Sequence, residues 1–254
     1  MNKFYQFIIR LRSAFIFSSQ KRKNFRNKHL NPNLINGLGN KIIIIKDGQE
    51  FDYSYRKIDN LNIFIQGNNN LIKIEYPCNI FNSRIHIRGN NNTVNIKKCH
   101  PTGFRNASFE MGSIADNRKI IIDEGFSCGG VEIVNNISGN SVEIGKDCMF
   151  SDEIHLRADD GHVIYNDANA IANNSTYLKI GNHVWVSRRS YIGKNVEIAD
   201  NCIIGFGAIV TKSQKEKNSI IAGNPAKIIK RNISWVRYNH NEIITKKEEL
   251  CNHE

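Results

Sequence analysis

An apolar residue recurs at every sixth position between Val142 and Val210, with a single interruption. The nine positions are Ile144, Phe150, Leu156, Ile180, Val186, Ile192, Ile198, Ile204 and Val210. With 40% of the chain apolar, such a run would occur by chance in roughly one of a thousand tries, allowing for all six phases. A period of six fits neither an α-helix nor a plain hairpin sheet, but it fits short flat strands separated by regular corners.

Two further slots accompany each of these positions. The slot two residues earlier holds Val142, Cys148, Ile154, Leu178, Val184, Ser190, Val196, Cys202 and Ala208. The slot one residue later is mostly small and holds Gly145, Ser151, Arg157, Gly181, Ser187, Gly193, Ala199, Gly205 and Thr211. Three such strands close one triangular coil: the large residue fills the corner, the earlier slot points inward, and the small residue lets the backbone turn. The pattern therefore predicts an all-β solenoid.

This repeat resembles the hexapeptide-repeat acyltransferases, and the resemblance implies a left-handed parallel β-helix. Three further matches narrow it: Asp160-Gly161-His162 at the interruption, Val184-Trp185 after it, and the run IIAGNPAKIIKR from Ile220 to Arg231. Together these motifs resemble the branch that O-acetylates bacterial surface glycans. They cover about the C-terminal half of the chain, so the expectations for the other half rest on its own residues.

Charge and cysteine usage limit the alternatives. The formal net charge is +11, but residues 1–30 alone hold eight Lys or Arg and no acid, so the excess is concentrated in one short segment. No nucleic-acid-binding module is recognisable. The six cysteines show no CxxC spacing, which favours reduced packing residues in a cytoplasmic protein.

The first 30 residues are expected to form a basic amphipathic helical segment. Phe4, Phe7 and Leu11 alternate with basic residues, and the arginines at 10 and 12 argue against a membrane span or a secretory signal. One interpretation is a helix that packs on the end of the solenoid. The other is a peripheral anchor on an anionic membrane surface, where each basic residue contributes on the order of 1 kcal/mol.

Residues 31–141 are expected to form irregular β-coils continuous with the regular helix at 142–213. The motif GNNN occurs at Gly67 to Asn70 and again at Gly89 to Asn92, 22 residues later, about one longer coil. Asn and Gly tolerate left-handed backbone conformations, which suits them to corners. A separate lectin-like module is the alternative for this region. Residues 214–254 are expected to form a cofactor-binding turn followed by a helical tail from Ile228 to Leu250 that covers the open end of the solenoid.

The interruption is expected to be an excursion loop at 162–179. His162 stands where the next aliphatic corner should fall, and the six-residue count resumes only at Ile180. Transfer of an acetyl group to a sugar hydroxyl needs a base, and an imidazole is suited to take the proton at neutral pH. His162 also matches the catalytic histidine of the resembled family, so it is the candidate base; the alternative is a corner histidine bonded to loop backbone. His155 and His183 occupy outward positions and are expected to be solvated or at a subunit contact.

Two residues are candidates to assist His162. Asp160 could accept a hydrogen bond from the imidazole and fix its tautomer, although Asp159 competes for this role and an Asp before Gly also simply makes turns. In the resembled family a tryptophan at the position of Trp185 lines the tunnel for the thioester and the acceptor. An aromatic residue at a subunit interface is the other interpretation of Trp185, and both can hold.

The resemblance implies acetyl-CoA as co-substrate. The sequence shows no metal-ligand set, so no metal is predicted. Coenzyme A carries phosphates that bind cations, and Lys212, Lys227 and Lys230 match the family's contact positions, with Arg231 beside them. A solvated basic face is the other interpretation of these lysines. The matching positions for pantetheine contacts are Gly205, Phe206 and Thr211, of which Phe206 is larger than the usual residue.

The sequence therefore predicts an acetyl-CoA-dependent O-acetyltransferase for a cell-surface glycan such as a capsular polysaccharide or a lipooligosaccharide, with sialic acid as one candidate acceptor. Direct transfer with His162 as base is expected, and the family implies a homotrimer. Two alternatives remain at this stage: an acetyltransferase for a small acceptor such as a nucleotide-linked amino sugar or serine, and a noncatalytic β-helix with a structural or glycan-binding role.

Overall fold

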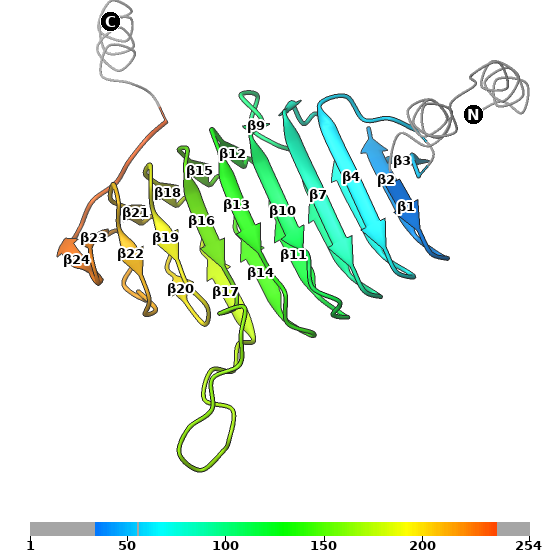
Figure 1. Cartoon of the computed structure of the whole chain (residues 1–254). Helices are drawn as coiled ribbons and strands as arrows, with labels where there is room; N and C mark the ends of the chain where they lie inside the picture. Colours follow the sequence, from blue (N-terminus) through cyan, green and yellow to red (C-terminus); the bar gives the residue numbers. More distant parts are fainter. Residues whose placement is uncertain (1–33, 55, 238–254) are drawn as a thin grey trace, which may run out of the picture.

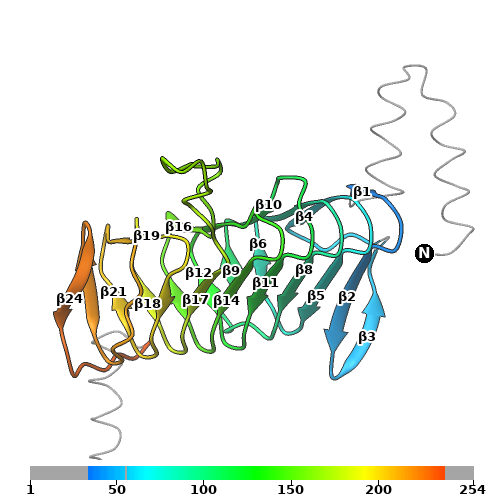
Figure 2. The ribbon, with the colours of Figure 1, turned by 90° about the horizontal axis from the view of Figure 1, so that it is seen from below.

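Three sheets wind around one axis in the computed structural model, which describes residues 34–54 and 56–237 (Figures 1 and 2). The first sheet consists of β1 (Leu34–Asn36), β4 (Leu61–Gln66), β7 (Ser83–Arg88), β10 (Ala107–Met111), β13 (Val131–Val134), β16 (Ile154–Arg157), β19 (Tyr191–Ile192) and β22 (Ile209–Val210). The second consists of β2 (Lys41–Lys46), β3 (Gln49–Asp52), β5 (Leu71–Glu75), β8 (Thr93–Ile96), β11 (Lys119–Ile122), β14 (Ser141–Ile144), β17 (Tyr177–Ile180) and β20 (Glu197–Ile198). The third consists of β6 (Ile80–Phe81), β9 (Phe104–Arg105), β12 (Ser127–Cys128), β15 (Met149–Phe150), β18 (Trp185–Val186), β21 (Ile203–Ile204), β23 (Ile220–Gly223) and β24 (Ala226–Lys230). From β4 to β22, successive strands visit the three sheets in turn, so each of these coils is a triangle.

The core follows the six-residue period. All nine corner residues are at most 2% exposed, and the nine residues two positions earlier are at most 1% exposed, Ser190 included. Neighbouring regular coils pair in register 18 residues apart, as between Trp185 and Ile203. Parallel pairing at this spacing stacks like residues over one another, so the sequence repeat becomes a continuous apolar column.

The earlier coils are longer but belong to the same sheets. Leu71 pairs with Thr93 at a spacing of 22 residues, and β10 and β11 pair directly with β13 and β14. Residues 34–141 are therefore continuous with the regular coils. The two GNNN motifs stack at one corner, where the buried Asn70 and Asn92 join in a side-chain ladder: Asn92 Nδ2 donates to Asn70 Oδ1 over 3.0 Å. The ladder supplies partners for backbone groups that a corner would otherwise leave unpaired.

Glycine is required at this same corner. Gly67 has a φ of +134°, and a Cβ built on it would lie 1.9 Å from the carbonyl oxygen of Gly89. A Cβ built on Gly37 would likewise lie 1.9 Å from the carbonyl oxygen of Gly67. Successive coils therefore approach so closely here that no side chain fits between them.

Two antiparallel strands cover the ends of the solenoid. β3 pairs with β2 at one end, and β24 pairs with β23 at the other. The predicted helical tail from Ile228 is thus wrong where the structure describes it: residues 226–230 are a strand, and residues 231–237 contain no helix. An antiparallel strand forms hydrogen bonds with the free backbone N–H and C=O groups at the edge of β23, whereas a helix would only cover them. The remainder of the tail, beyond 237, lies outside the described residues.

The cysteines differ in part from the expectation. Cys78 and Cys99 form a disulfide between successive coils, with 4.7 Å between their Cα atoms, so the prediction of reduced packing residues is wrong for this pair. Cys128, Cys148 and Cys202 are free and buried, as predicted. The sixth cysteine and the amphipathic segment 1–30 lie outside the described residues. Among the residues that are described, no helix has the length and hydropathy needed to cross a membrane.

Candidate active site

The excursion leaves the solenoid after β16 and returns at β17 as a projecting hairpin (Figure 1). Tyr165 and Ile171 pair across it as an antiparallel bridge. The coils on either side keep their stacking, since Leu178 still pairs with Val142 in the coil below. The predicted loop is therefore present, and His162 lies exposed at its base.

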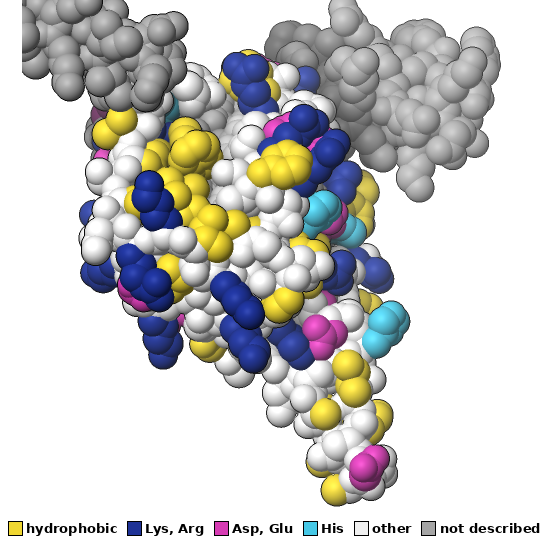
Figure 3. All heavy atoms as spheres, turned by 90° about the vertical axis from the view of Figure 1, so that its left-hand side faces the viewer, with side chains coloured by type: hydrophobic (Ala, Val, Ile, Leu, Met, Phe, Trp, Pro, Cys, Tyr) yellow, Lys and Arg dark blue, Asp and Glu magenta, His cyan; other side chains and the backbone are white. Residues whose placement is uncertain are grey.

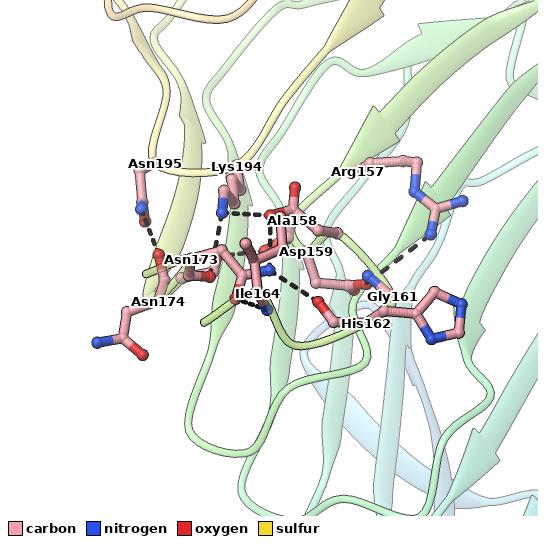
Figure 4. A network of polar contacts seen from close by, with 12 residues as sticks. Arg157, Ala158, Asp159, Gly161, His162, Ile164, Asn173, Asn174, Lys194 and Asn195 are labelled. Atoms are coloured by element: carbon pink, nitrogen blue, oxygen red, sulfur yellow. Dashed lines mark hydrogen bonds and ion pairs between the residues drawn. The ribbon is translucent and has the colours of Figure 1, made fainter. Parts of the chain in front are cut away.

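A network of polar contacts holds the base of this loop (Figure 4). Asp159, only 1% exposed, accepts hydrogen bonds from the backbone N–H groups of Gly161 and Asn136, each over 2.8 Å. Asn173 donates to the His162 carbonyl oxygen over 2.7 Å and to Asp160 Oδ2 over 2.9 Å. The backbone at His162 is thus fixed from both sides of the loop.

The imidazole of His162 takes no part in this network. Figure 4 shows the ring pointing away from the other labelled side chains, and no described residue forms a hydrogen bond with it. Asp160 instead accepts a hydrogen bond from the Lys194 ammonium, which together with Asn173 outweighs burial and lowers the pKa of the carboxyl group. The predicted bond from the ring to Asp160 is absent, and Asp159 does not replace it. Both carboxylates position the loop.

His162 borders a hollow of about 270 Å³ beside the loop. Its lining consists of Ser113, Asn136, Ile137, Asp159, Gly161, His162, Val163, Ile171, Asn173, Asn174 and Ser175. The lining includes both polar and apolar side chains, so it offers hydrogen-bond partners together with apolar surface. A hydroxyl group that enters this hollow would lie beside His162.

Trp185 lies on a different face of the prism. It belongs to β18 in the third sheet, whereas the loop of His162 leaves at the corner between the first and second sheets. In a triangular coil that corner is opposite the third sheet, and Trp185 does not line the hollow beside His162. A single chain therefore does not bring these two candidate residues together.

The basic residues gather at the end of the solenoid. A hollow of about 420 Å³ there is lined by Thr211, Lys212, Gln214, Pro225, Ala226, Lys227, Ile228 and Arg231. Figure 3 views this end and shows Lys and Arg side chains around an apolar area, with the loop projecting below. Arg231 also donates to Glu216 over 2.8 Å. Three cations and a hydroxyl around one hollow fit phosphate groups.

Three of the other candidates lie outside this hollow. Lys230 is exposed on β24, and Gly205 and Phe206 lie at the corner after β21, where Phe206 is 65% exposed. A Cβ on Gly205 would approach Ala222 to 2.8 Å, so packing against the next coil explains this glycine. In residues 34–54 and 56–237, no group of three or more His, Cys, Asp or Glu side chains could hold a metal ion.

Sequence reasoning missed Lys194, Asn173 and Trp235. Lys194 and Asn173 lie 34 and 13 residues from the Asp160 they bind, and no local motif connects them. Trp235 was expected on a helix, but it is 7% exposed and stacks on His183. His183, expected to be solvated or at a subunit contact, is covered on one face by Trp235 and is therefore not fully solvated. The signal available in the sequence was Trp235 itself, a large aromatic residue shortly after the end of the repeat.

The parallel triangular coils, the histidine loop and the basic end define a hexapeptide-repeat transferase. Residues 178–212 match the model of the bacterial transferase hexapeptide family (six repeats). The polysialic acid O-acetyltransferase of Neisseria meningitidis is 37% identical over 176 residues, 67% of this chain and 77% of that protein. The polysialic acid O-acetyltransferase of Escherichia coli O1:K1 / APEC is 37% identical over 129 residues, 50% of this chain, so the match spans only 41% of that relative.

Solved structures agree with these relatives. The polySia specific acetyltransferase NeuO superposes with a TM-score of 0.65 at 31% identity, covering 87% of this chain and 95% of that one. The polysialic acid O-acetyltransferase OatWY superposes with a TM-score of 0.68 at 29% identity, covering 87% and 98%. The chain belongs to the hexapeptide-repeat O-acetyltransferase family that includes these proteins, and its fold is the left-handed parallel β-helix that the resemblance implied.

Proposed function

We propose that the protein transfers an acetyl group from acetyl-CoA to a hydroxyl group of a sialic acid polymer at the bacterial surface. The reaction class, O-acetyl transfer, follows from the membership of the chain in this family. The loop that holds His162 above an accessible hollow, together with the basic hollow at the end of the solenoid, supports an acceptor site and a donor site on this scaffold.

The imidazole of His162 supplies the base. It takes the proton of the acceptor hydroxyl as the oxygen attacks the thioester carbonyl carbon, and the resulting imidazolium returns a proton to the departing thiolate sulfur. Because its backbone is fixed while the ring is unbonded, the ring can turn toward a bound hydroxyl. The buried Cys128 and Cys148 are poor nucleophiles, since burial raises the pKa of their thiols to about 12.

We further propose that each active site combines two subunits of a homotrimer. His162 and Trp185 lie on different faces of one chain, so His162 of one subunit meets Trp185 of its neighbour if the coils associate side by side. The donor then lies in the groove between the subunits, with its phosphates toward Lys212 and Lys227.

Incubation with acetyl-CoA and a panel of glycans tests both statements. We expect a mass gain of one acetyl group on polysialic acid, a large loss in His162→Ala and in Trp185→Ala, and recovery when the two variants are coexpressed. Random mixing leaves both residues intact in about a quarter of the shared sites, so about a quarter of the wild-type rate should return. Activity on a small acceptor alone would contradict the polymer substrate, and no recovery would contradict the shared site.

Lys227→Ala is expected to raise the KM for acetyl-CoA about tenfold with little change in kcat, because it removes one charge-assisted contact to phosphate, about 1.4 kcal/mol. Initial rates at varied acetyl-CoA measure this. Lys57→Ala is the control, because Lys57 is exposed near the other end of the solenoid, where it pairs with Asp59 at 3.9 Å. Equal KM values for the two variants would indicate that the phosphates of acetyl-CoA do not bind near Lys227.

A further inference from the structure

The segment after β24 turns back along the solenoid and is held over three coils (Figure 1). We call residues 231–237 the strap. Its Trp235 lies against the coil of β18, and its Arg237 reaches the two coils before it. The guanidinium of Arg237 donates to Asp147 Oδ1 over 2.8 Å, to Ser127 Oγ over 2.7 Å and to the carbonyl oxygen of Gly125 over 2.9 Å.

His183 is the centre of this contact. Its Nδ1 lies 2.6 Å from Asp147 Oδ2, and its Nε2 lies 3.0 Å from the carbonyl oxygen of Trp235. The Trp235 indole stacks on the imidazole, with 4.0 Å between ring centroids and 11° between planes, and its Nε1 donates to the His183 carbonyl oxygen over 2.9 Å. The imidazole therefore faces oxygen atoms at both of its ring nitrogens.

Both of these oxygen atoms can only accept. A backbone carbonyl oxygen has no proton to give, and Asp147 is ionised: burial opposes ionisation, but the hydrogen bonds from Arg237 and His183 outweigh it and lower the pKa of the carboxyl group. A neutral imidazole carries one N–H, so it can satisfy one of the two partners. Two hydrogen bonds to two acceptors require the doubly protonated ring, and the stacked indole face also favours a cation.

The surrounding charges are few and mixed. Arg237 faces Asp147 from the strap, and His100 lies near both from the neighbouring coil, where burial and then Arg237 lower the pKa of its imidazole. Asp200 approaches from the following coil, bound to the Asn182 backbone N–H over 2.8 Å and to Lys217 over 3.0 Å. His183 is the group in this cluster that needs an added proton to complete both of its hydrogen bonds.

The strap also contacts a candidate active-site residue. The rings of Trp235 and Trp185 lie 6.1 Å apart between centroids, tilted by 48°. We propose that protonated His183 is a clamp that holds the strap on the third sheet and thereby positions the ring of Trp185, and that loss of this proton releases the strap. The role of Trp185 in transfer rests on the function proposed above; the clamp itself does not.

The direction of the pH effect follows from the bonds. At low pH both ring nitrogens donate and the strap is closed. As the pH rises, one nitrogen loses its proton and its lone pair then faces an oxygen atom, so that contact becomes repulsive and Trp235 separates from the imidazole. His183 is thus a positioning residue whose effect disappears at high pH.

Tryptophan fluorescence tests the clamp without any need for activity, because the chain contains two tryptophans and both lie in this cluster. In the full-length Trp185→Phe variant, emission reports Trp235 alone. We expect one step as the pH rises, with higher intensity and a red shift on the alkaline side. The cause is that a stacked imidazolium quenches an indole and that release exposes the indole to water.

The step is expected to vanish when His183→Gln is added to this variant and to remain with His155→Gln or His100→Gln. His155 is the matched control, since it also bonds a carboxylate, Glu132 over 3.2 Å, but lies on the first sheet. A step that survives His183→Gln, or no step in Trp185→Phe, overturns the clamp. Circular dichroism of each variant checks that the fold is retained.

A rate measurement in the otherwise wild-type chain tests the positioning of Trp185. His183→Gln is expected to transfer acetyl more slowly than the wild type at low pH, with the difference closing as the pH rises and the wild-type strap opens. A constant ratio of rates across the pH range contradicts positioning. Failure of acetyl transfer in the wild type would refute the proposed function and leave the fluorescence result standing.

Discussion

Replacement of His162 by glutamine is expected to lower kcat for acetyl transfer by about 10²–10⁴-fold and to leave the melting temperature unchanged. Glutamine keeps a polar side chain of similar reach but cannot take a proton from the acceptor hydroxyl. The fold should not respond, because the ring forms no hydrogen bond with any described residue and the loop is held through the His162 backbone instead.

His155→Gln is the control for this experiment. His155 is also exposed, lies seven residues earlier on β16, and bonds Glu132 rather than a group near the loop. Steady-state rates with saturating acetyl-CoA and thermal unfolding of both variants provide the comparison. Near-full activity in His162→Gln, or equal losses in the two variants, would exclude His162 as the base.

Gly67→Ala is expected to destabilise the fold by about 3–5 kcal/mol, through a strained backbone conformation and an overlap with the next coil. The added methyl group would lie 1.9 Å from the Gly89 carbonyl oxygen, a backbone atom that cannot move without separating two coils. For a chain of this size the melting temperature should fall by about 10 °C.

Gly139→Ala separates the two causes. Gly139 also has a left-handed φ, of +76°, but a Cβ built on it meets no atom within 4 Å. It should therefore cost only about 1–2 kcal/mol, the penalty of the backbone conformation alone. Thermal unfolding followed by circular dichroism measures both variants, and similar losses would show that the close approach of the coils is unimportant.

The regular half of the fold was predictable because its period is local. Each corner is encoded within six residues, and all nine apolar corners predicted between Ile144 and Val210 are buried. The coils before Ser141 vary in length and use Asn and Gly corners, so no fixed period shows them, although the two GNNN motifs gave the 22-residue spacing correctly.

The errors share one physical cause, which is that distant residues decide the outcome. The segment Ala226–Lys230 became a strand because the edge of β23 was open to pair with it. Asp160 is two residues from His162 in sequence, but the ammonium of Lys194, 34 residues away, takes its carboxylate. Cys78 and Cys99 are 21 residues apart, about one early coil, so they stack on neighbouring coils. The coil length could have indicated this disulfide, whereas the search for CxxC spacing could not.

The excursion adds no strand to any sheet, and the coils above and below it stack as though it were absent. Its length and composition can therefore change without altering the register of the solenoid, since neither β16 nor β17 depends on the hairpin tip for pairing. Under the proposed function, such a scaffold could accept a different glycan through changes in this loop alone, while the basic end and the apolar interior stay the same.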